Sequence, residues 1–468
     1  MLTKTIQNLQ GLWSRLKLGR TPYILIGVYL LLTTLLVYLN PQSDVAFLLF
    51  LVSIGLIYTL PTNMRYKLIL GLVIALIIVP VIGFRNIFYF EIIFQISLFS
   101  ALALGLNIVV GFTGLLNFGY MAFYAVGAYL WAFFGSQQMY LLHSIPGSSP
   151  ATNAFFLPAN TFYLFIFLGL IVAAVVGILL GLPVMRVRGD YLAIVTLGFG
   201  EVIQEIANNL DKPINLTNGP QGITPIQRPI IPTWILDAWN TIFQPIVGRP
   251  ISLGEFYNFF FYLLALIMVI VIIVVVIRLD DSKTGRAWVA IREDEAAASA
   301  MGIPVVRYKL IAFAVAASFA GVMGVLFAAD RTFVSPDSFS FMQSIGVLTM
   351  VILGGLGSIP GVILGASVVV VLNLQILQAL SLWLNDLRQS GIVIPLINFP
   401  MSDLSSQLDP AKYQRMLFGL ILIIMMIYRQ EGLIPARRRK RDKTAPSQAP
   451  AAASASALAE TEAEHGAA

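Results

Sequence analysis

Two carboxylates one helical turn apart could carry chemistry inside a membrane. Glu201 and Glu205 lie in the apolar segment 191–207, with Gln204 beside them. A charged side chain at the centre of a bilayer costs about 2.5–3.5 kcal/mol, so such residues usually serve a function. These two acids could form a proton relay. Alternatively, because polar residues follow at 208–211, the helix ends near Glu201 and both acids lie at the outer interface.

A second charged feature is the segment 284–303, TGRAWVAIREDEAAASAMGI, hereafter the coupling segment. It lies between the apolar runs 256–277 and 310–328, each long enough to cross a bilayer as a helix. Its pattern predicts one short helix that ends at Gly302. A charged, ordered helix between membrane spans must dock on something in water. The segment therefore indicates a transport subunit that another protein drives.

Polar residues also occur inside the predicted spans. Asn107, Asn117, Tyr120 and Tyr124 lie in the glycine-rich run 105–130. Amide groups in hydrocarbon need partners, so these residues either join helices or line a pathway that binds an amino or carboxyl group. A second set comprises Gly354, Gly355 and Gly357, which precede Pro360 and predict a broken helix at membrane depth.

Several kinds of chemistry are absent from the sequence. The chain has no Cys and only two His, His143 and His465, so we expect no metal site, cofactor or histidine base. The phosphate-binding pattern G-x-x-x-x-G-K-[ST] does not occur, so the chain cannot hydrolyse ATP by that route. We expect a non-catalytic protein that uses an ion gradient or a separate ATPase.

The composition decides which elements position these residues. Of 468 residues, 58% are hydrophobic and 11% are charged, whereas soluble domains carry about a quarter charged residues. The chain is therefore predicted to be an all-α polytopic membrane protein. The basic residues lie between and beyond the apolar runs, which argues against nucleic-acid binding. We expect about 10–12 transmembrane or re-entrant helices. The apolar runs are 22–39, 45–60, 68–84, 91–110, 115–134, 162–182, 190–207, 254–277, 308–328, 340–357, 360–379 and 412–428.

The basic residues predict the orientation. If every run crosses, one side holds 21 of the 29 Lys and Arg residues, and that side is expected to be cytoplasmic. Both termini and the coupling segment then lie in the cytoplasm. Residues 1–21 are predicted to form an amphipathic helix at the membrane surface. Residues 436–468 are predicted to be a basic membrane anchor followed by a disordered tail, the anchor being Arg437, Arg438, Arg439, Lys440 and Arg441.

Several stretches together resemble a known family, the larger permease subunits of ABC importers for branched-chain amino acids. They lie in order over about residues 90–435, and the extra spans at 22–84 also suit that subunit. The core is expected at 85–435. The stretches are LGLNIVVGFTGLLNFGYMAFYAVGAY (104–129), GDYLAIVTLGFGEV (189–202), NLTNGPQGI (215–223), GRAWVAIREDEAAASAMGI (285–303), SPDSFSFMQS (335–344), VILGGLGS (351–358) and YRQEGLIP (428–435).

The resemblance implies that 285–303 is the coupling helix that docks on a cytoplasmic ATPase. The general importer pattern there is E-A-A, three residues, then Gly. Ala297, Ala298 and Gly302 match, but Glu295 lies one place early, which leaves open which acid contacts the ATPase. The residues expected to serve coupling are Gly285, Arg286, Trp288, Arg292, Glu293, Asp294, Glu295 and Gly302.

The resemblance also implies partners and a location. The partners are a second permease, ABC ATPase subunits, an extracytoplasmic amino-acid-binding protein and membrane lipid, and the location is the bacterial inner membrane. The expected substrate is leucine, isoleucine or valine, while similar permeases carry urea or short amides. The competing class is a proton-coupled transporter that uses Glu201 and Glu205, but it leaves the coupling segment without a task.

Overall fold

The fold is taken from a computed structural model. The structure describes residues 21–59, 64–138, 155–185, 187, 190–212, 214–389, 393–394, 399–400, 409–429 and 431–435. These residues form helices and their connections, apart from a two-residue antiparallel pair of strands, Val393–Ile394 and Phe399–Pro400. The expectation of an all-α protein is confirmed. The predicted surface helix at 1–21, except its last residue, and the basic anchor and tail at 436–468 lie outside the described residues.

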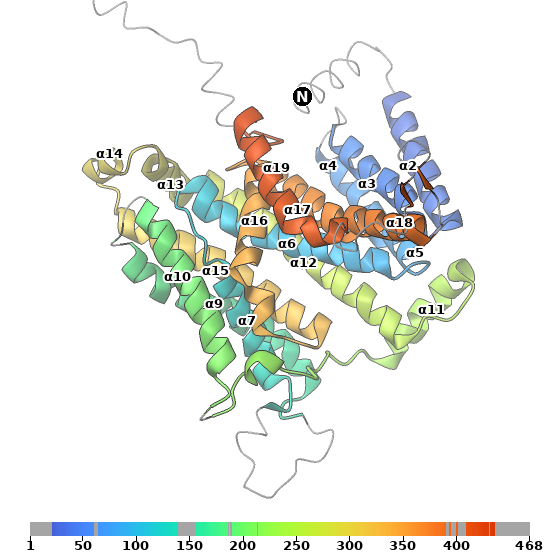
Figure 1. The fold of residues 1–468 in the computed structure, drawn as a ribbon, viewed down its shortest axis with the longest axis horizontal. Coiled ribbons are helices and arrows are strands. Elements are labelled where there is room, and N and C mark those ends of the chain that lie inside the picture. Colours follow the sequence, from blue (N-terminus) through green and yellow to red (C-terminus); the bar gives the residue numbers. More distant parts are fainter. Residues whose placement is uncertain are drawn as a thin grey trace, which may run out of the picture.

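The first half of the chain contributes a series of long apolar helices (Figure 1). They are α2 (Thr21–Leu39), α3 (Asp44–Thr59), α4 (Met64–Val73), the π-helix η1 (Ile74–Ile78), α5 (Val79–Gly83), α6 (Phe88–Asn107), the π-helix η2 (Ile108–Phe112), α7 (Met121–Phe134), α9 (Phe162–Val184) and α10 (Asp190–Asn209).

The second half adds an amphipathic helix, the charged segment and further long helices. They are α11 (Thr233–Val247), α12 (Leu253–Asp281), α13 (Lys283–Glu293), α14 (Glu295–Ala300), α15 (Val305–Arg331), α16 (Phe341–Gly354), α17 (Ile359–Val371), the π-helix η6 (Leu372–Ile376), α18 (Leu377–Gln389) and α19 (Gln414–Tyr428). Short 3₁₀ turns occupy Ala159–Thr161, Gly219–Gln221, Pro336–Phe339 and Pro410–Tyr413.

Six helical stretches of the described chain are long and apolar enough to cross a membrane, and five more are apolar over 10–17 residues. Six candidate spans are thus found in the described part of the chain, and the expected total of about 10–12 transmembrane or re-entrant helices stays a prediction. One expected span, 190–207, lies on α10, which belongs to neither group. The acids and amides of α10 lower its hydropathy below that of the helices around it.

α9 packs closely along α15. Gly169, Ala173, Gly177 and Gly181 recur every four residues on α9, and all four are buried. A Cβ on Gly321 of α15 would lie 2.4 Å from both the Cβ of Ala173 and the carbonyl oxygen of Gly169. Small residues thus let the two backbones approach closely, as membrane helices require where lipid provides no hydrophobic drive.

The N-terminal helices form a second hydrophobic cluster of their own. Phe47 of α3 stacks on Tyr89 of α6, with ring centroids 4.1 Å apart. The hydroxyl of Tyr262 on α12 donates a hydrogen bond to the carbonyl of Ala75, at 2.8 Å. Phe243 of α11 packs into the same cluster. The helices of residues 21–83 therefore attach to the rest of the protein through the aromatic faces of α6 and α12.

The charged helices lie at one end of the molecule. Figure 1 shows α13 and α14 at the upper left and α11 at the lower right, with α12 running between them. The position of α13 and α14 determines which of the sequence-predicted residues can act together.

Candidate coupling site and translocation pathway

The coupling segment forms two helices, not the single helix predicted. α13 ends at Glu293, and α14 begins at Glu295. Between them Asp294 has extended backbone, and its carboxylate accepts hydrogen bonds from the N–H groups of Ala296, at 2.8 Å, and Ala297, at 3.0 Å. Asp294 is thus the N-cap of a new helix, a preferred role of this residue type.

The predicted glycine stop is present. α14 ends at Ala300, and Gly302 has a φ of +81°, a conformation that favours glycine. Ser282 caps the start of α13 just before the coupling segment, and Gly302 lies at the other end of that segment.

One face of α13 is turned into the protein. The indole of Trp288 is fully buried, stacks on Phe112 with centroids 6.4 Å apart, and donates a hydrogen bond to the carbonyl of Tyr308 at 2.8 Å. Gly285 is also buried, and a Cβ there would lie 2.4 Å from the carbonyl oxygens of Leu279 and Asp280. Both residues therefore hold α13 against α12 and α15.

Arg292 extends the same inward contact. Its guanidinium donates a hydrogen bond to the carbonyl of Gly111, in the π-helix η2. A Cβ on Gly111 would lie 2.6 Å from the amide nitrogen of Gly357. The coupling segment, η2 and the glycine-rich connection at 355–358 thus meet around Gly111.

Residues 107–121, hereafter the junction segment, hydrogen-bond to four more parts of the described chain besides Arg292 of α13. The side-chain oxygen of Asn107 accepts from the N–H of Gly357, and the hydroxyl of Tyr120 donates to the carbonyl of Ala316 on α15. The other two bonds are from Phe118 N–H to the hydroxyl of Thr196 on α10 and from Met121 N–H to the hydroxyl of Ser344 on α16, at 3.1 and 3.2 Å.

These contacts show how the predicted pathway residues are used within this chain. Asn107 and Tyr120 join helices, and Tyr124 packs between the rings of Phe327 and Phe339. Asn117 caps its own turn by accepting from Gly119 N–H at 3.0 Å. The amide nitrogens of Asn107 and Asn117 are buried without a hydrogen-bond partner in the described part of the chain. That they line the pathway stays a prediction.

The glycine cluster connects two helices. α16 ends at Gly354 and α17 begins at Ile359, so the helix breaks where the sequence predicted, while its depth in the membrane stays a prediction. The N–H of Leu433 donates to the carbonyl of Leu353, and the N–H of Ile434 donates to the carbonyl of Gly354. Gly355 has a φ of +120°, and a Cβ there would lie 2.6 Å from the carbonyl oxygen of Ile434. Glycine is needed here because the segment 431–435 packs directly on the connection.

Glu201 and Glu205 lie on an uncovered face of α10. Both side chains are exposed, on the same face as Tyr191 and Ile194, which are 72% and 65% exposed. The carboxylate of Glu205 accepts a hydrogen bond from the side chain of Asn209 at 2.7 Å. Gln204 is partly buried. Because α10 continues to Asn209, the alternative that this helix ends near Glu201 is wrong.

The acids of the coupling segment differ in their surroundings. Glu295 forms an ion pair with Lys309 of α15 at 2.7 Å, and Lys309 is only 5% exposed. Asp294 caps α14, as described above. Glu293 is exposed, and its carboxylate forms no hydrogen bond or ion pair with any described residue. Of the three acids, Glu293 is therefore the one whose carboxylate stays available to a partner.

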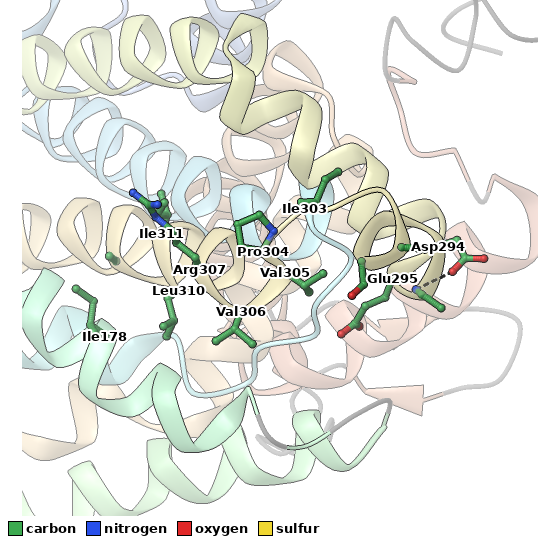
Figure 2. Close-up of a pocket in the computed structure, with 14 residues that line it drawn as sticks. Ile178, Asp294, Glu295, Ile303, Pro304, Val305, Val306, Arg307, Leu310 and Ile311 are labelled. Carbon is green, nitrogen blue, oxygen red and sulfur yellow. Dashed lines mark hydrogen bonds between the residues drawn. The ribbon is translucent and has the colours of Figure 1, made fainter.

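A groove of about 1350 Å³ adjoins α14 (Figure 2). Asp294 and Glu295 lie at one end and Ile178 at the other, with Pro304, Val306 and Leu310 between them. Met301, which directly follows α14, is 84% exposed. An apolar groove with a charged end can receive an amphipathic helix of another protein.

A comparison with known families places the chain. The model of the family described as "Branched-chain amino acid transport system / permease component" matches residues 88–426. The chain belongs to this family. The matched range begins at α6 and so leaves out the helices of residues 21–83. The predicted family is confirmed, and the protein is a multi-pass transport permease.

Similarity to individual relatives supports the same family assignment. The chain is 36% identical to the high-affinity branched-chain amino acid transport system permease protein LivM of Salmonella typhimurium and 35% identical to that of Escherichia coli. Each comparison covers 73% of this chain and 68% of the relative. The corresponding protein LivH of Escherichia coli is 38% identical over 21% of this chain and 30% of its own length. No solved structure matches.

Three residues of the site were not predicted from the sequence. Lys309, Thr196 and Ser344 each bond to a predicted site residue or to the junction segment. For Lys309 a signal existed, because a lone lysine near the start of an apolar run needs a buried partner. Thr196 and Ser344 carried no signal, since single hydroxyl residues are common in membrane helices.

Proposed function

We propose that this permease is the larger membrane subunit of an ATP-driven importer for branched-chain amino acids. In this proposal α13 and α14 face the cytoplasm and dock on a separate ATPase subunit, which supplies the energy. The single observation that carries it is the two-sided coupling segment. Its inner face contacts the junction segment, while Arg286, Glu293 and Met301 remain exposed and a groove adjoins α14.

The substrate and partners follow from the relatives. Two of them are named as permeases of a high-affinity branched-chain amino acid transport system, and LivH is a second permease of such a system. We infer that leucine, isoleucine or valine is carried, and that the complete importer contains a second permease, ATPase subunits and an extracytoplasmic binding protein. The bacterial inner membrane is the proposed location, and the distribution of basic residues supports an orientation with both termini in the cytoplasm.

The pathway is proposed to lie along the uncovered face of α10. Glu201 and Glu205 are exposed on this face and carry charge that hydrocarbon would disfavour. If this face of α10 met the second permease across a polar pathway, the two carboxylates would avoid that cost. Membrane proteins place such residues toward the bundle interior or a water-filled cavity.

The first test changes the exposed part of the coupling segment. Glu293→Arg combined with Met301→Asp should abolish ATPase co-purification and amino-acid uptake, because the docking surface loses its charge and apolar contact. The folded permease should still reach the membrane, since neither side chain is buried. Asp237→Arg, an exposed charge reversal on α11 at the other end of the molecule, is the matched control. Normal uptake by the double variant would refute the docking assignment.

A second measurement separates this proposal from a proton-coupled carrier. Uptake by the reconstituted importer should stop when the ATPase loses its phosphate-binding lysine and should continue after a protonophore collapses the proton gradient. The opposite pair of results would favour a proton relay through Glu201 and Glu205.

A further inference from the structure

The inner face of α13 presents two side chains, Trp288 and Arg292, to η2. We propose that these are the positioning residues through which movement of α13 reaches the junction segment and then α10. This inference rests on the proposed docking of the coupling segment on an ATPase. It adds a route inside this chain, from α13 through η2 and Thr196 to the face that carries Glu201 and Glu205.

Trp288 is the anchor of this route. Its indole is fully buried, so it cannot rotate away when α13 moves. The ring stacks on Phe112, the last residue of η2, and its nitrogen is bonded to the backbone of α15. A shift of α13 therefore displaces η2 or breaks the indole contacts. Packed interiors resist small gaps, so displacement of the packed unit is the expected response.

Arg292 adds a hydrogen bond between α13 and η2. Its charged donor reaches the carbonyl of Gly111, and charge-assisted hydrogen bonds are roughly twice as strong as neutral ones. The Cγ of Arg292 lies against Gly114, where a Cβ would come within 3.0 Å of it and where φ is +74°. Arg292 therefore contacts η2 at its carbonyl and at the turn that follows.

The receiving element, η2, is a π-helical turn and not a regular α-helix. In η2 the N–H of Thr113 bonds to the carbonyl of Ile108, five residues back, and the N–H of Leu115 bonds to the carbonyl of Val109. Such π-helical turns are rare and occur frequently at functional sites. Residues 113–120 then continue as a turn without regular helix before α7 begins at Met121.

The junction segment passes the movement to α10 by backbone contact. A Cβ on Gly119 would lie 2.1 Å from the carbonyl oxygen of Thr196, so the two backbones touch with no side chain between them. The Thr196 hydroxyl also accepts from Phe118 N–H. Glu201 follows Thr196 by five residues on the same helix. A chain of packed contacts thus joins α13 to the proposed pathway face.

The experiment compares Arg292→Ala with Lys283→Ala in the complete importer reconstituted in lipid vesicles. Lys283 is an exposed basic residue at the first position of the same helix, outside the coupling segment, and its side chain forms no hydrogen bond or ion pair with the junction segment in the described part of the chain. For Arg292→Ala we expect assembly and ATP hydrolysis stimulated by the binding protein to persist, while leucine uptake falls about tenfold or more. Arg292→Lys should recover part of the uptake, because it restores a charged donor. Lys283→Ala should retain both activities.

A second readout follows the junction segment itself. The chain has no cysteine, so Leu116→Cys, at a position 40% exposed in that segment, gives a single reactive site. With Arg292 present, trapping the ATPase with ATP and vanadate should change the maleimide reaction rate of this cysteine. With Arg292→Ala the rate should be the same with and without nucleotide.

The outcomes are separable. Normal uptake by Arg292→Ala, or a nucleotide-dependent rate at Leu116→Cys that survives this substitution, would overturn the route while leaving the docking proposal intact. Parallel loss of ATP hydrolysis and uptake in Arg292→Ala would also overturn it, because the residue would then serve docking or folding. If nucleotide leaves the Leu116→Cys rate unchanged even with Arg292, and the Glu293 and Met301 variant transports normally, the proposed function itself fails.

Discussion

α9 and α10 are consecutive helices of similar length, yet their uncovered faces differ in kind. The exposed side chains of α9 are all apolar or aromatic, among them Leu164, Phe167 and Ile171. α10 instead exposes Glu201 and Glu205 beside its apolar residues. Lipid can cover the first face without loss of hydration, but it would desolvate the two carboxylates of the second. We therefore expect lipid to cover the exposed face of α9 and a polar surface to meet the exposed face of α10.

The largest effect is expected at the covered face of α9. Gly321→Leu should destabilise the subunit by about 3 kcal/mol or more, since even its Cβ would overlap Ala173 and the backbone of Gly169. Thermal unfolding of the purified subunit in detergent measures this. Gly198→Leu on α10, where no atom lies within 4 Å of the added Cβ, is the matched control and should leave that stability unchanged. Equal destabilisation by both variants would contradict the packing described.

A smaller effect is expected on the uncovered face of α10. Replacing Glu201 and Glu205 by Leu should lower uptake about tenfold or more, because a charged hydrogen-bonding group is worth about 1.5–3 kcal/mol. The unfolding temperature of the subunit should not fall, since neither carboxylate is buried. Uptake that stays normal, together with better membrane insertion, would show that this face meets lipid as α9 does.

The smallest effect is expected on the uncovered face of α9. Phe167→Ala should change the free energy of unfolding by no more than about 0.5 kcal/mol and leave uptake intact, as is usual for surface positions away from special contacts. Uptake in vesicles and thermal unfolding in detergent measure both quantities. A strong loss of uptake would mean that α9, too, faces a partner protein.

Local patterns in the sequence predicted much of this arrangement. The small residues at four-residue spacing on α9 indicated close helix packing, and Gly302 indicated the end of the coupling segment. Both signals act over a few residues and need no tertiary information. The break at Asp294 was missed because an aspartate inside a helical pattern can be either an exposed residue or a cap. Tertiary packing of α13 and α14 decides between them.

Long-range contacts could not be predicted in the same way. Arg292 and Gly111 are separated by 181 residues, and Tyr120 and Ala316 by 196. Charge made Arg292 a candidate for a partner protein, although its guanidinium in fact bonds to the backbone of η2. Glu295 was assigned to the same partner, although Lys309 pairs with it. The sequence shows that a residue is charged. It does not show which partner the residue has, because the partner depends on how the helices assemble.

The aromatic attachment of residues 21–83 sets a condition on any shorter version of this fold. Without those helices, Tyr89 would lose its stacking partner Phe47, and the hydroxyl of Tyr262 would lose the carbonyl of Ala75 that accepts its hydrogen bond. A truncated permease would then need phenylalanine at 262 or a bound lipid with a suitable acceptor. The helices of residues 21–83 thus determine the environment of one face of α6 and α12, and removing these helices would replace protein contacts on that face with contacts to lipid.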